Sequence, residues 1–208
     1  MSVRDENKQD ASGFPATRGA EADDERRLGP LREYAAGLRA RHGAVPDVDP
    51  DDGGTGARLL ILLETPGPRI HRTGIVSAHN PSGTARNLRR FLETAGLPRH
   101  ERVIWNAVPW VIHGDGPNRA PRPGEIRSGL AELPGFLALL PDLRATVLAG
   151  RVAGMAADTV AAAHPGAAVI RMPHPSPTYV CTSPEVPRRI ALALTEAAAL
   201  LGYGSGGA

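Results

Sequence analysis

The residues best suited to chemistry by type and spacing lie in residues 172–177, which read MPHPSP. Three prolines in this segment fix their own φ angles and push the residues before them, including His174 and Ser176, toward extended backbone. The segment is therefore stiff, and it presents one imidazole and one hydroxyl directly after the apolar run 168–170. Such a loop suits a site that holds a hydrogen-bond donor at a fixed point. Taken alone, the pattern is more typical of an ordinary proline-rich turn, so a functional interpretation depends on what lies near it.

Two other apolar runs lead into residues that could form the rest of a site. Residues 58–63 are followed by Glu64, Thr65, Pro66 and Gly67, and residues 102–108 contain Asn106 and are followed by Pro109 and Trp110. An amide such as that of Asn106 both donates and accepts hydrogen bonds. The structural alternatives are a turn-forming Asn106 and a Glu64 carboxylate paired with a nearby arginine.

The elements that must position these residues alternate along the chain. Apolar runs predict strands over 58–63, 102–108, 145–148 and 168–171, and helical spacing predicts helices over 31–43, 85–95 with Thr84 as the N-cap, 123–137, 151–163 and 184–201. This order favours an α/β fold, a three-layer sandwich with a central, mainly parallel four-stranded sheet and helices on both faces. Ligands in such folds sit at the carboxyl ends of the strands, so we expect the three polar segments to converge on one cleft.

Composition suggests one domain with a tail at each end. The chain has 208 residues, of which 41% are hydrophobic and 22% charged, as is usual for a soluble domain with a sizeable core. Residues 1–28 mix charges with almost no aliphatic content and predict a disordered tail. Residues 46–56 predict a linker or surface loop. We therefore expect one α/β domain over 29–202 and a second short tail over 203–208.

Several classes of site are excluded by the residues that the chain lacks. Cys181 is the only cysteine, which excludes an intramolecular disulfide, a four-cysteine iron–sulfur site and a cysteine-based zinc site. The seven histidines form no HxxxH pair, so neither a metal nor another cofactor is expected. The longest aliphatic string, residues 59–63, is far too short to span a bilayer, and no leader-like start precedes it. We expect a cytoplasmic monomer with no membrane partner.

Charge is distributed unevenly along the chain. Residues 65–122 hold nine arginines and three acidic residues, a net charge of +6, although the whole chain carries only +2. Arginine binds phosphate oxygens in a bidentate manner, and a one-sided basic surface is typical of proteins that bind polyanions. The alternative is a solvated face in an arginine-rich chain, since Lys8 is the only lysine. Composition alone does not decide between the two interpretations.

The order of the three polar segments resembles that of the uracil-DNA glycosylase superfamily. The matching segments read LETPG at 63–67, WNAV at 105–108 and HPSP at 174–177, and residues 81–88 resemble the segment that leads into the family's first long helix. The resemblance covers the chain from about residue 58 to the end of the last predicted helix. It implies a three-layer α/β domain that flips a base out of DNA into a pocket.

The resemblance implies a role for each candidate residue. Glu64 would position water, His174 would donate to O2 of the departing base, and Asn106 would read the O4 and N3–H edge of uracil. The base pocket would be completed by Pro66, Gly67, Asn80 and Trp110, and the DNA contacts would come from Ser176, Thr178, Tyr179, Arg86, Arg89 and Arg151. Among these, Ser176 would bind a phosphate, and residues 178–180 would press into the minor groove as a wedge.

The chain departs from the family pattern at two places. Thr65 stands where the best-known branch has a water-activating aspartate, and residues 75–77 offer no aromatic platform for the base, which leaves Trp110 as a substitute. The branch with an iron–sulfur cluster is excluded by the single cysteine. The leading hypothesis is a metal-independent glycosylase that removes uracil or a related deaminated base from DNA. The alternatives are a non-catalytic binder of damaged DNA on the same fold and a hydrolase of free nucleosides or nucleotides.

Overall fold

The sheet at the centre of the molecule is built from four short apolar strands that all run parallel. The computed structural model describes residues 16–113 and 119–204. The strands lie in the order β4-β2-β5-β6, with bounds β2 (Leu59–Leu63), β4 (Arg102–Asn106), β5 (Ala145–Ala149) and β6 (Ala168–Met172). Four of the five residues of β2 are buried, as expected for a strand covered on both faces. The predicted strands are therefore confirmed to within two residues at each end.

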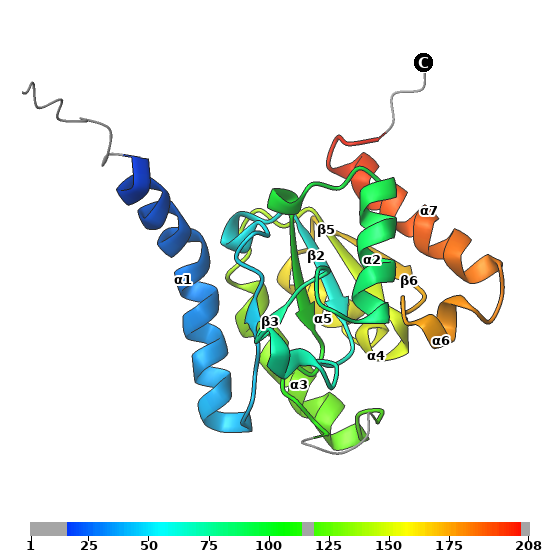
Figure 1. The fold of residues 1–208 in the computed structure, drawn as a ribbon, viewed down its shortest axis with the longest axis horizontal. Helices are drawn as coiled ribbons and strands as arrows, with labels where there is room; N and C mark the ends of the chain where they lie inside the picture. Colours follow the sequence, from blue (N-terminus) through cyan, green and yellow to red (C-terminus); the bar gives the residue numbers. More distant parts are fainter. Residues whose placement is uncertain (1–15, 114–118, 205–208) are drawn as a thin grey trace, which may run out of the picture.

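Helices cover both faces of this sheet, which confirms the predicted three-layer α/β architecture (Figure 1). One face is covered by α2 (Gly83–Thr94) and α7 (Glu185–Leu200), with the short α6 (Pro177–Val180) packed against both. The other face is covered by α3 (Pro123–Leu137), α4 (Gly150–Gly154) and α5 (Ala157–Ala163). The helix predicted over 151–163 is thus two helices, separated by Met155 and Ala156.

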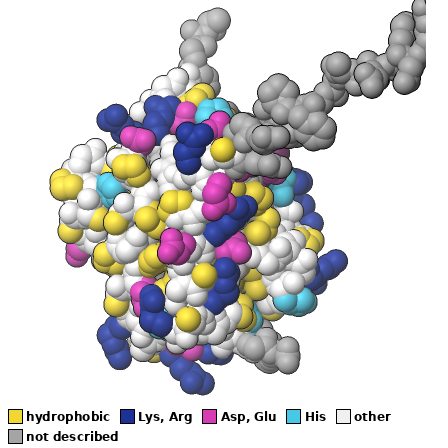
Figure 2. All heavy atoms as spheres, turned by 90° about the vertical axis from the view of Figure 1, so that its left-hand side faces the viewer, with side chains coloured by type: hydrophobic (Ala, Val, Ile, Leu, Met, Phe, Trp, Pro, Cys, Tyr) yellow, Lys and Arg dark blue, Asp and Glu magenta, His cyan; other side chains and the backbone are white. Residues whose placement is uncertain are grey.

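A long helix, α1 (Ala16–His42), packs outside this framework against α3 and against a small second sheet. That sheet consists of β1 (Asp47–Val48) and β3 (Ile75–Val76), which pair in parallel. Figure 2 faces α1 and shows acidic and basic side chains mixed over this side of the molecule. No helix of the described residues is long and apolar enough to cross a membrane.

The prediction of a disordered tail over residues 1–28 is wrong for the part that the structure describes. α1 begins at Ala16, and the Leu28 side chain is only 1% exposed. Leu28 lies one turn before Leu31 on the same helix face, so the apolar stripe continues toward the N-terminus among charged neighbours. Residues 1–15 lie outside the described part of the chain.

The prediction of a linker over residues 46–56 is also wrong. Asp49 and Asp52 are buried there and pair with Arg99, at distances of 2.6 and 3.1 Å between nitrogen and oxygen atoms. Arg27 of α1 donates to the Asp52 carbonyl and to that of Pro50, the latter at 2.9 Å. The acidic segment is therefore a packed part of the fold, and arginines that are distant in sequence hold it in place.

At the C-terminus, the prediction of a tail over 203–208 fails for its first residue. The Tyr203 hydroxyl donates to Glu101 at 2.8 Å, and its ring packs against the core. Residues 205–208 lie outside the described part of the chain.

Candidate active site

Two of the three predicted polar loops meet in one cavity at the carboxyl edge of the sheet. The cavity has a volume of about 640 Å³. Predicted site residues on its wall are Glu64, Thr65, Gly67, Arg151, His174, Ser176, Thr178 and Tyr179. Glu64 follows β2 and His174 follows β6, and β5 lies between these two strands. The carboxylate and the imidazole therefore share one space, as the sequence predicted.

Asn106 lines a second, smaller cavity that adjoins the first. This space of about 170 Å³ also contacts Pro66 and Asn80, and its wall shares Gly67 and Thr84 with the larger cavity. Thr84 is free for this position because Ser82, and not the predicted Thr84, caps α2 by accepting a hydrogen bond from Ala85 N at 3.1 Å. The amide thus lines a space that shares part of its wall with the cavity of the carboxylate and the imidazole.

The Asn106 side chain lacks hydrogen-bond partners in the described part of the protein. Asn106 is only 2% exposed, and both its Nδ2 and its Oδ1 are buried without a partner. Leaving a buried polar group unsatisfied costs about 1–3 kcal/mol, so such groups are rare unless a ligand uses them. An adjacent donor and acceptor that line a cavity form a complementary surface for a carbonyl next to an N–H.

A backbone contact sets the hydrogen-bonding state of His174. Nδ1 of the imidazole accepts a hydrogen bond from the Ser176 backbone N–H at 3.2 Å. Burial lowers the pKa of His174, so the ring is neutral at pH 7 and carries its proton on Nε2. The free Nε2–H is therefore a donor that adds no positive charge to the cavity.

Gly150, at the start of α4, allows the His174 loop to come close to the end of β5. Its φ angle is +88°, and a Cβ atom placed there would lie 3.0 Å from Cβ of His174. The loop is also held from the other side, where Asn87 Nδ2 on α2 donates to the Pro175 carbonyl at 3.0 Å. The position of the imidazole is thus fixed by contacts with two neighbouring elements as well as by the prolines.

Glu64 is half-buried, and its environment acts on its charge in two opposing ways. Burial raises the pKa of Glu64, whereas the positive charge of Arg151 lowers it. Arg151 is exposed and lines the same cavity. A carboxylate in this position can orient water at neutral pH while keeping a basicity above that of a solvated glutamate.

The match to a family model agrees with this geometry. The model of the "Uracil DNA glycosylase superfamily" matches residues 50–196, which include every strand of the main sheet and all three loops. The chain belongs to the uracil DNA glycosylase superfamily.

Two other comparisons add nothing to this assignment. No curated protein matches the chain. A structure of the SBP FpvC from P. aeruginosa in complex with a Ni²⁺ ion matches with 19% identity and a TM-score of 0.34, covering 92% of this chain and 52% of that chain. The superfamily member described here thus spans about half the length of FpvC, and so weak a likeness carries no argument.

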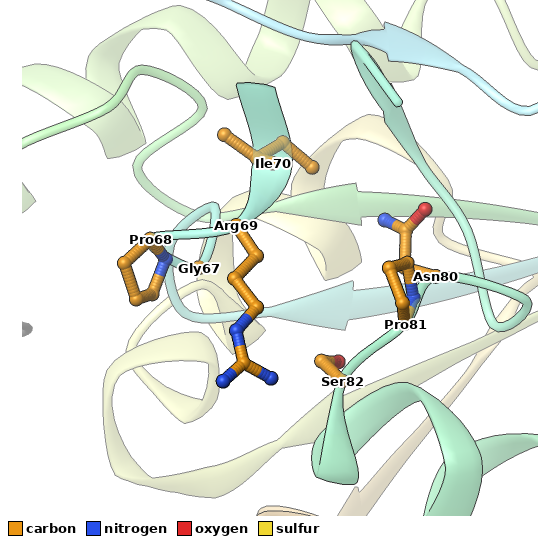
Figure 3. A pocket seen from close by; sticks show the side chains of 7 residues that line it. All are labelled: Gly67, Pro68, Arg69, Ile70, Asn80, Pro81 and Ser82. Atoms are coloured by element: carbon orange, nitrogen blue, oxygen red, sulfur yellow. The ribbon is translucent and has the colours of Figure 1, made fainter. Parts of the chain in front are cut away.

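Asn80 lies on a pocket wall of this superfamily member, as the sequence predicted. It lines the cavity of Asn106 and a third space of about 230 Å³, whose walls are drawn in Figure 3. Its Oδ1 accepts from Thr73 at 2.9 Å and its Nδ2 donates to the Ile75 carbonyl at 2.8 Å. Both polar atoms of this amide therefore form hydrogen bonds within the protein, and these bonds hold the pocket wall in place.

Trp110 does not replace the missing aromatic platform. It is 8% exposed and stacks on His42 of α1, with ring centroids 4.0 Å apart and planes 12° apart. It lines none of the three cavities described above. The apolar side chains on the wall of the Asn106 cavity are aliphatic, among them Ile70, Val76 and Leu88. The superfamily's stacking contact has no aromatic counterpart among these lining residues.

The predicted basic surface over residues 65–122 is partly neutralised within the fold. Acidic partners lie within 4.0 Å of four of its nine arginines: Arg89, Arg99, Arg102 and Arg119. Most of these acids lie outside the window, which is why a local count of charges missed them. Arg86 and Arg89 are also absent from the walls of the three cavities, whereas the predicted Arg151 lines the largest one.

Sequence reasoning missed two arginines on the wall of the 640 Å³ cavity, Arg171 and Arg189. Arg171 is an exposed residue near the end of β6, and its position at a strand terminus beside the HPSP segment was a usable signal. Arg189 belongs to α7, and nothing in its local sequence distinguishes it from Arg188. Among the described residues no group of three His, Cys, Asp or Glu side chains could hold a metal ion.

Proposed function

We propose that this protein hydrolyses the N-glycosidic bond of uracil, or of a related deaminated base, in DNA. The observation that carries the proposal is the unpartnered Asn106 amide, buried in a cavity that adjoins the one lined by Glu64 and His174. A uracil edge presents O4 as an acceptor and N3–H as a donor, which complement Nδ2 and Oδ1 of Asn106. The base would reach this cavity by flipping out of the stack.

In the proposed reaction, the N1–C1′ bond breaks while water adds to C1′. The base departs with the bonding electron pair, and the Nε2–H of His174 donates a hydrogen bond to O2, where negative charge develops. Glu64 holds the water by accepting a hydrogen bond from it, and as the water oxygen bonds to C1′ its proton passes to the Glu64 carboxylate and from there to solvent. The products are a free base, protonated from solvent, and an abasic deoxyribose.

The neutral state of His174 supports this division of roles. An uncharged donor stabilises a developing anion without first attracting the flanking phosphates. A preorganised donor of this kind is worth about 3–4 kcal/mol of barrier. Ser176, Thr178 and Tyr179 extend the same cavity wall outward and are the proposed contacts to the DNA next to the flipped nucleotide.

The test is release of free base from a uracil-containing oligonucleotide by the wild-type chain and by His174→Ala. We expect the variant to be slower by a factor of about 10²–10³, in line with the loss of one preorganised donor. A panel with hypoxanthine, xanthine and thymine mismatches would identify the preferred base. A wild-type rate no higher than that of His174→Ala contradicts the proposal.

Asn106→Leu supplies a control that separates function from folding. The substitution removes a buried amide whose donor and acceptor have no partner, so we expect the free energy of unfolding to rise by about 1–3 kcal/mol while base release is lost. Thermal denaturation and the base-release assay on the same sample measure both. Loss of activity accompanied by loss of stability would mean that the amide serves the fold.

A non-catalytic binder of damaged DNA is the second candidate, favoured by Thr65 in place of a carboxylate and by the aliphatic side chains on the wall of the Asn106 cavity. It predicts salt-dependent binding of uracil-containing DNA without base release. Measured turnover eliminates it. Processing of a free nucleoside as fast as an oligonucleotide would instead favour a small-molecule hydrolase.

A further inference from the structure

Arginine side chains without an ion pair among the described residues gather on the wall of the 640 Å³ cavity. Three exposed arginines line that wall from three different elements: Arg151 from α4, Arg171 from β6 and Arg189 from α7. Within residues 22–113 and 119–204, the ion pairs closer than 4.0 Å are made by other arginines, such as Arg58, Arg99 and Arg119. Glu64, which lines the same cavity, offsets part of the charge of Arg151. Arg171 and Arg189 have no acidic partner within 4.0 Å among the described residues, and an anion bound between them relieves their mutual repulsion.

The guanidinium of Arg171 is fixed in place by the backbone. Its Nη1 donates to the Gly154 carbonyl at 2.9 Å, which ties β6 to the end of α4. The remaining N–H groups of this planar fork have no acceptor among the described residues. A guanidinium that is held at one nitrogen and open at the others can bind a phosphate in a fixed orientation with little further loss of entropy.

The position of these arginines relative to the reacting groups indicates what they would bind. Glu64 comes directly after β2, and β6 lies two strands away from β2 in the sheet. Two strand spacings amount to roughly 10 Å. This distance is about the rise of three nucleotides along one strand of B-DNA. Thr178 and Tyr179 line the cavity on the same side. The cavity therefore extends from Glu64 to the strand that carries Arg171 and leads to His174, a span comparable to a few nucleotides.

We propose that Arg171 and Arg189 form a phosphodiester-binding subsite for the DNA strand that continues beyond the flipped nucleotide. This inference rests on the proposed function, because that function places the flipped nucleotide at Glu64 and His174. The subsite holds the strand by its backbone, so it contributes affinity that is independent of base sequence. It also favours a polynucleotide over a free nucleoside, which has no phosphate to offer.

The test measures how strongly the full-length chain binds a fluorescent single-stranded oligonucleotide as salt is varied. Each phosphate contact contributes about 0.7 to the slope of log K against log salt concentration for a single strand. We expect Arg171→Ala and Arg189→Ala each to reduce the magnitude of that slope by about 0.7. The reduction is expected to be equal for oligonucleotides with and without uracil.

The chain offers a matched control for each variant. Arg188 is the exposed neighbour of Arg189 on α7 and lines none of the described cavities, and Arg144 is exposed just before β5, at the opposite edge of the sheet. We expect Arg188→Ala and Arg144→Ala to leave the slope unchanged. Equal slopes for Arg188→Ala and Arg189→Ala would overturn the subsite and leave only a diffuse charge effect.

Two further readouts separate the possible failures. Base release measured on the same proteins tests the proposed hydrolysis: a wild-type chain that shows the expected slopes but releases no base disproves the hydrolysis and leaves the subsite standing. Competition with inorganic phosphate and with a deoxyuridine monophosphate tests the occupant. If either competes with the oligonucleotide at equal molar concentration, the subsite binds a free phosphate group, and the assignment to a strand is wrong.

Discussion

At the residue scale, the proposed chemistry depends on the charge of one half-buried carboxylate. Burial raises the pKa of Glu64, and the nearby Arg151 opposes that rise. The neutral imidazole of His174 does not supply a compensating positive charge, because burial lowers its pKa. Arg151 is therefore the nearby group whose positive charge favours the ionised form of Glu64.

We predict that Arg151→Ala moves the acid limb of the kcat profile to higher pH. Removing the positive charge disfavours the carboxylate form, so the pKa of Glu64 rises further, and activity, which is present above that pKa, is lost earlier as pH falls. The measurement is kcat at saturating oligonucleotide from acid to neutral pH. Arg127→Ala, which changes an exposed arginine of α3, is expected to leave the limb in place. A limb that stays fixed in Arg151→Ala would show that Glu64 does not control the reaction.

The sequence was sufficient to place Asn106, Glu64 and His174 near the carboxyl ends of strands, because each ends or closely follows an apolar run in a parallel α/β pattern. It was not sufficient for Trp110, whose partner His42 is 68 residues away on α1. Nor did it distinguish Arg189 from Arg188, because only the packing of α7 decides which of two adjacent side chains reaches the cavity. Local patterns thus predicted the residues at strand ends and missed those selected by tertiary contacts.

At the scale of elements, the site is assembled by close approach between loops. Gly150 lies where β5 passes into α4, and its missing side chain is the space that the His174 loop occupies. The positive φ angle of Gly150 adds a second requirement for glycine, since other L-residues are strained in that region. Two loops from adjacent strands therefore depend on one residue without a Cβ atom.

We predict that Gly150→Ala lowers the free energy of unfolding by about 1–3 kcal/mol and lowers kcat by at least about tenfold. The loss of stability follows from backbone strain, and the loss of kcat follows from displacement of the imidazole. Gly96→Ala is the matched control, because Gly96 has a φ angle of +66° and open space around its Cβ position. The control is expected to lose stability and retain kcat. Equal kcat values for the two variants would contradict a contact role for Gly150.

Strand and helix positions were predicted well because hydrophobic periodicity is a local property. The acidic segment 46–56 was misread for the opposite reason: Asp49 and Asp52 look like a solvated loop until Arg99, almost fifty residues later, is brought beside them. Burial in this cluster raises the pKa of Asp52 to about 6, despite the arginines around it. Composition cannot reveal that a charged segment is buried when its counter-charges come from another part of the chain.

At the scale of the whole molecule, charges at the two edges of the sheet are organised differently. At the amino edge, Arg58 pairs with Glu101 at 2.6 Å, and Arg99 pairs with the buried Asp49 and Asp52. At the carboxyl edge, Arg171 and Arg189 face a cavity without acidic partners within 4.0 Å among the described residues. Charge compensation therefore stabilises the edge where the strands begin and is lacking at the edge where the polynucleotide is proposed to bind.

Around Leu28, α1 packs near the amino edge of the sheet, where the charges are paired. A substitution at Leu28 tests how much α1 contributes to stability. The Leu28 side chain is buried in the core, and the neighbouring Arg27 ties α1 to the carbonyls of residues 50 and 52. We predict that Leu28→Ala lowers the free energy of unfolding by about 2–5 kcal/mol, the range for deleting a fully buried leucine side chain.

Denaturant unfolding of the full-length chain measures this loss, and Leu192→Ala is the control, since Leu192 lies on α7 with 68% of its surface exposed. The control is expected to change stability by less than about 0.5 kcal/mol. The contacts of Leu28 lie on the α1 side of the fold, so base release at low temperature is expected to persist in Leu28→Ala. If Leu28→Ala and the wild type were equally stable, the Leu28 side chain would contribute nothing to the free energy of unfolding. That result would contradict the packing of this part of α1 against the core.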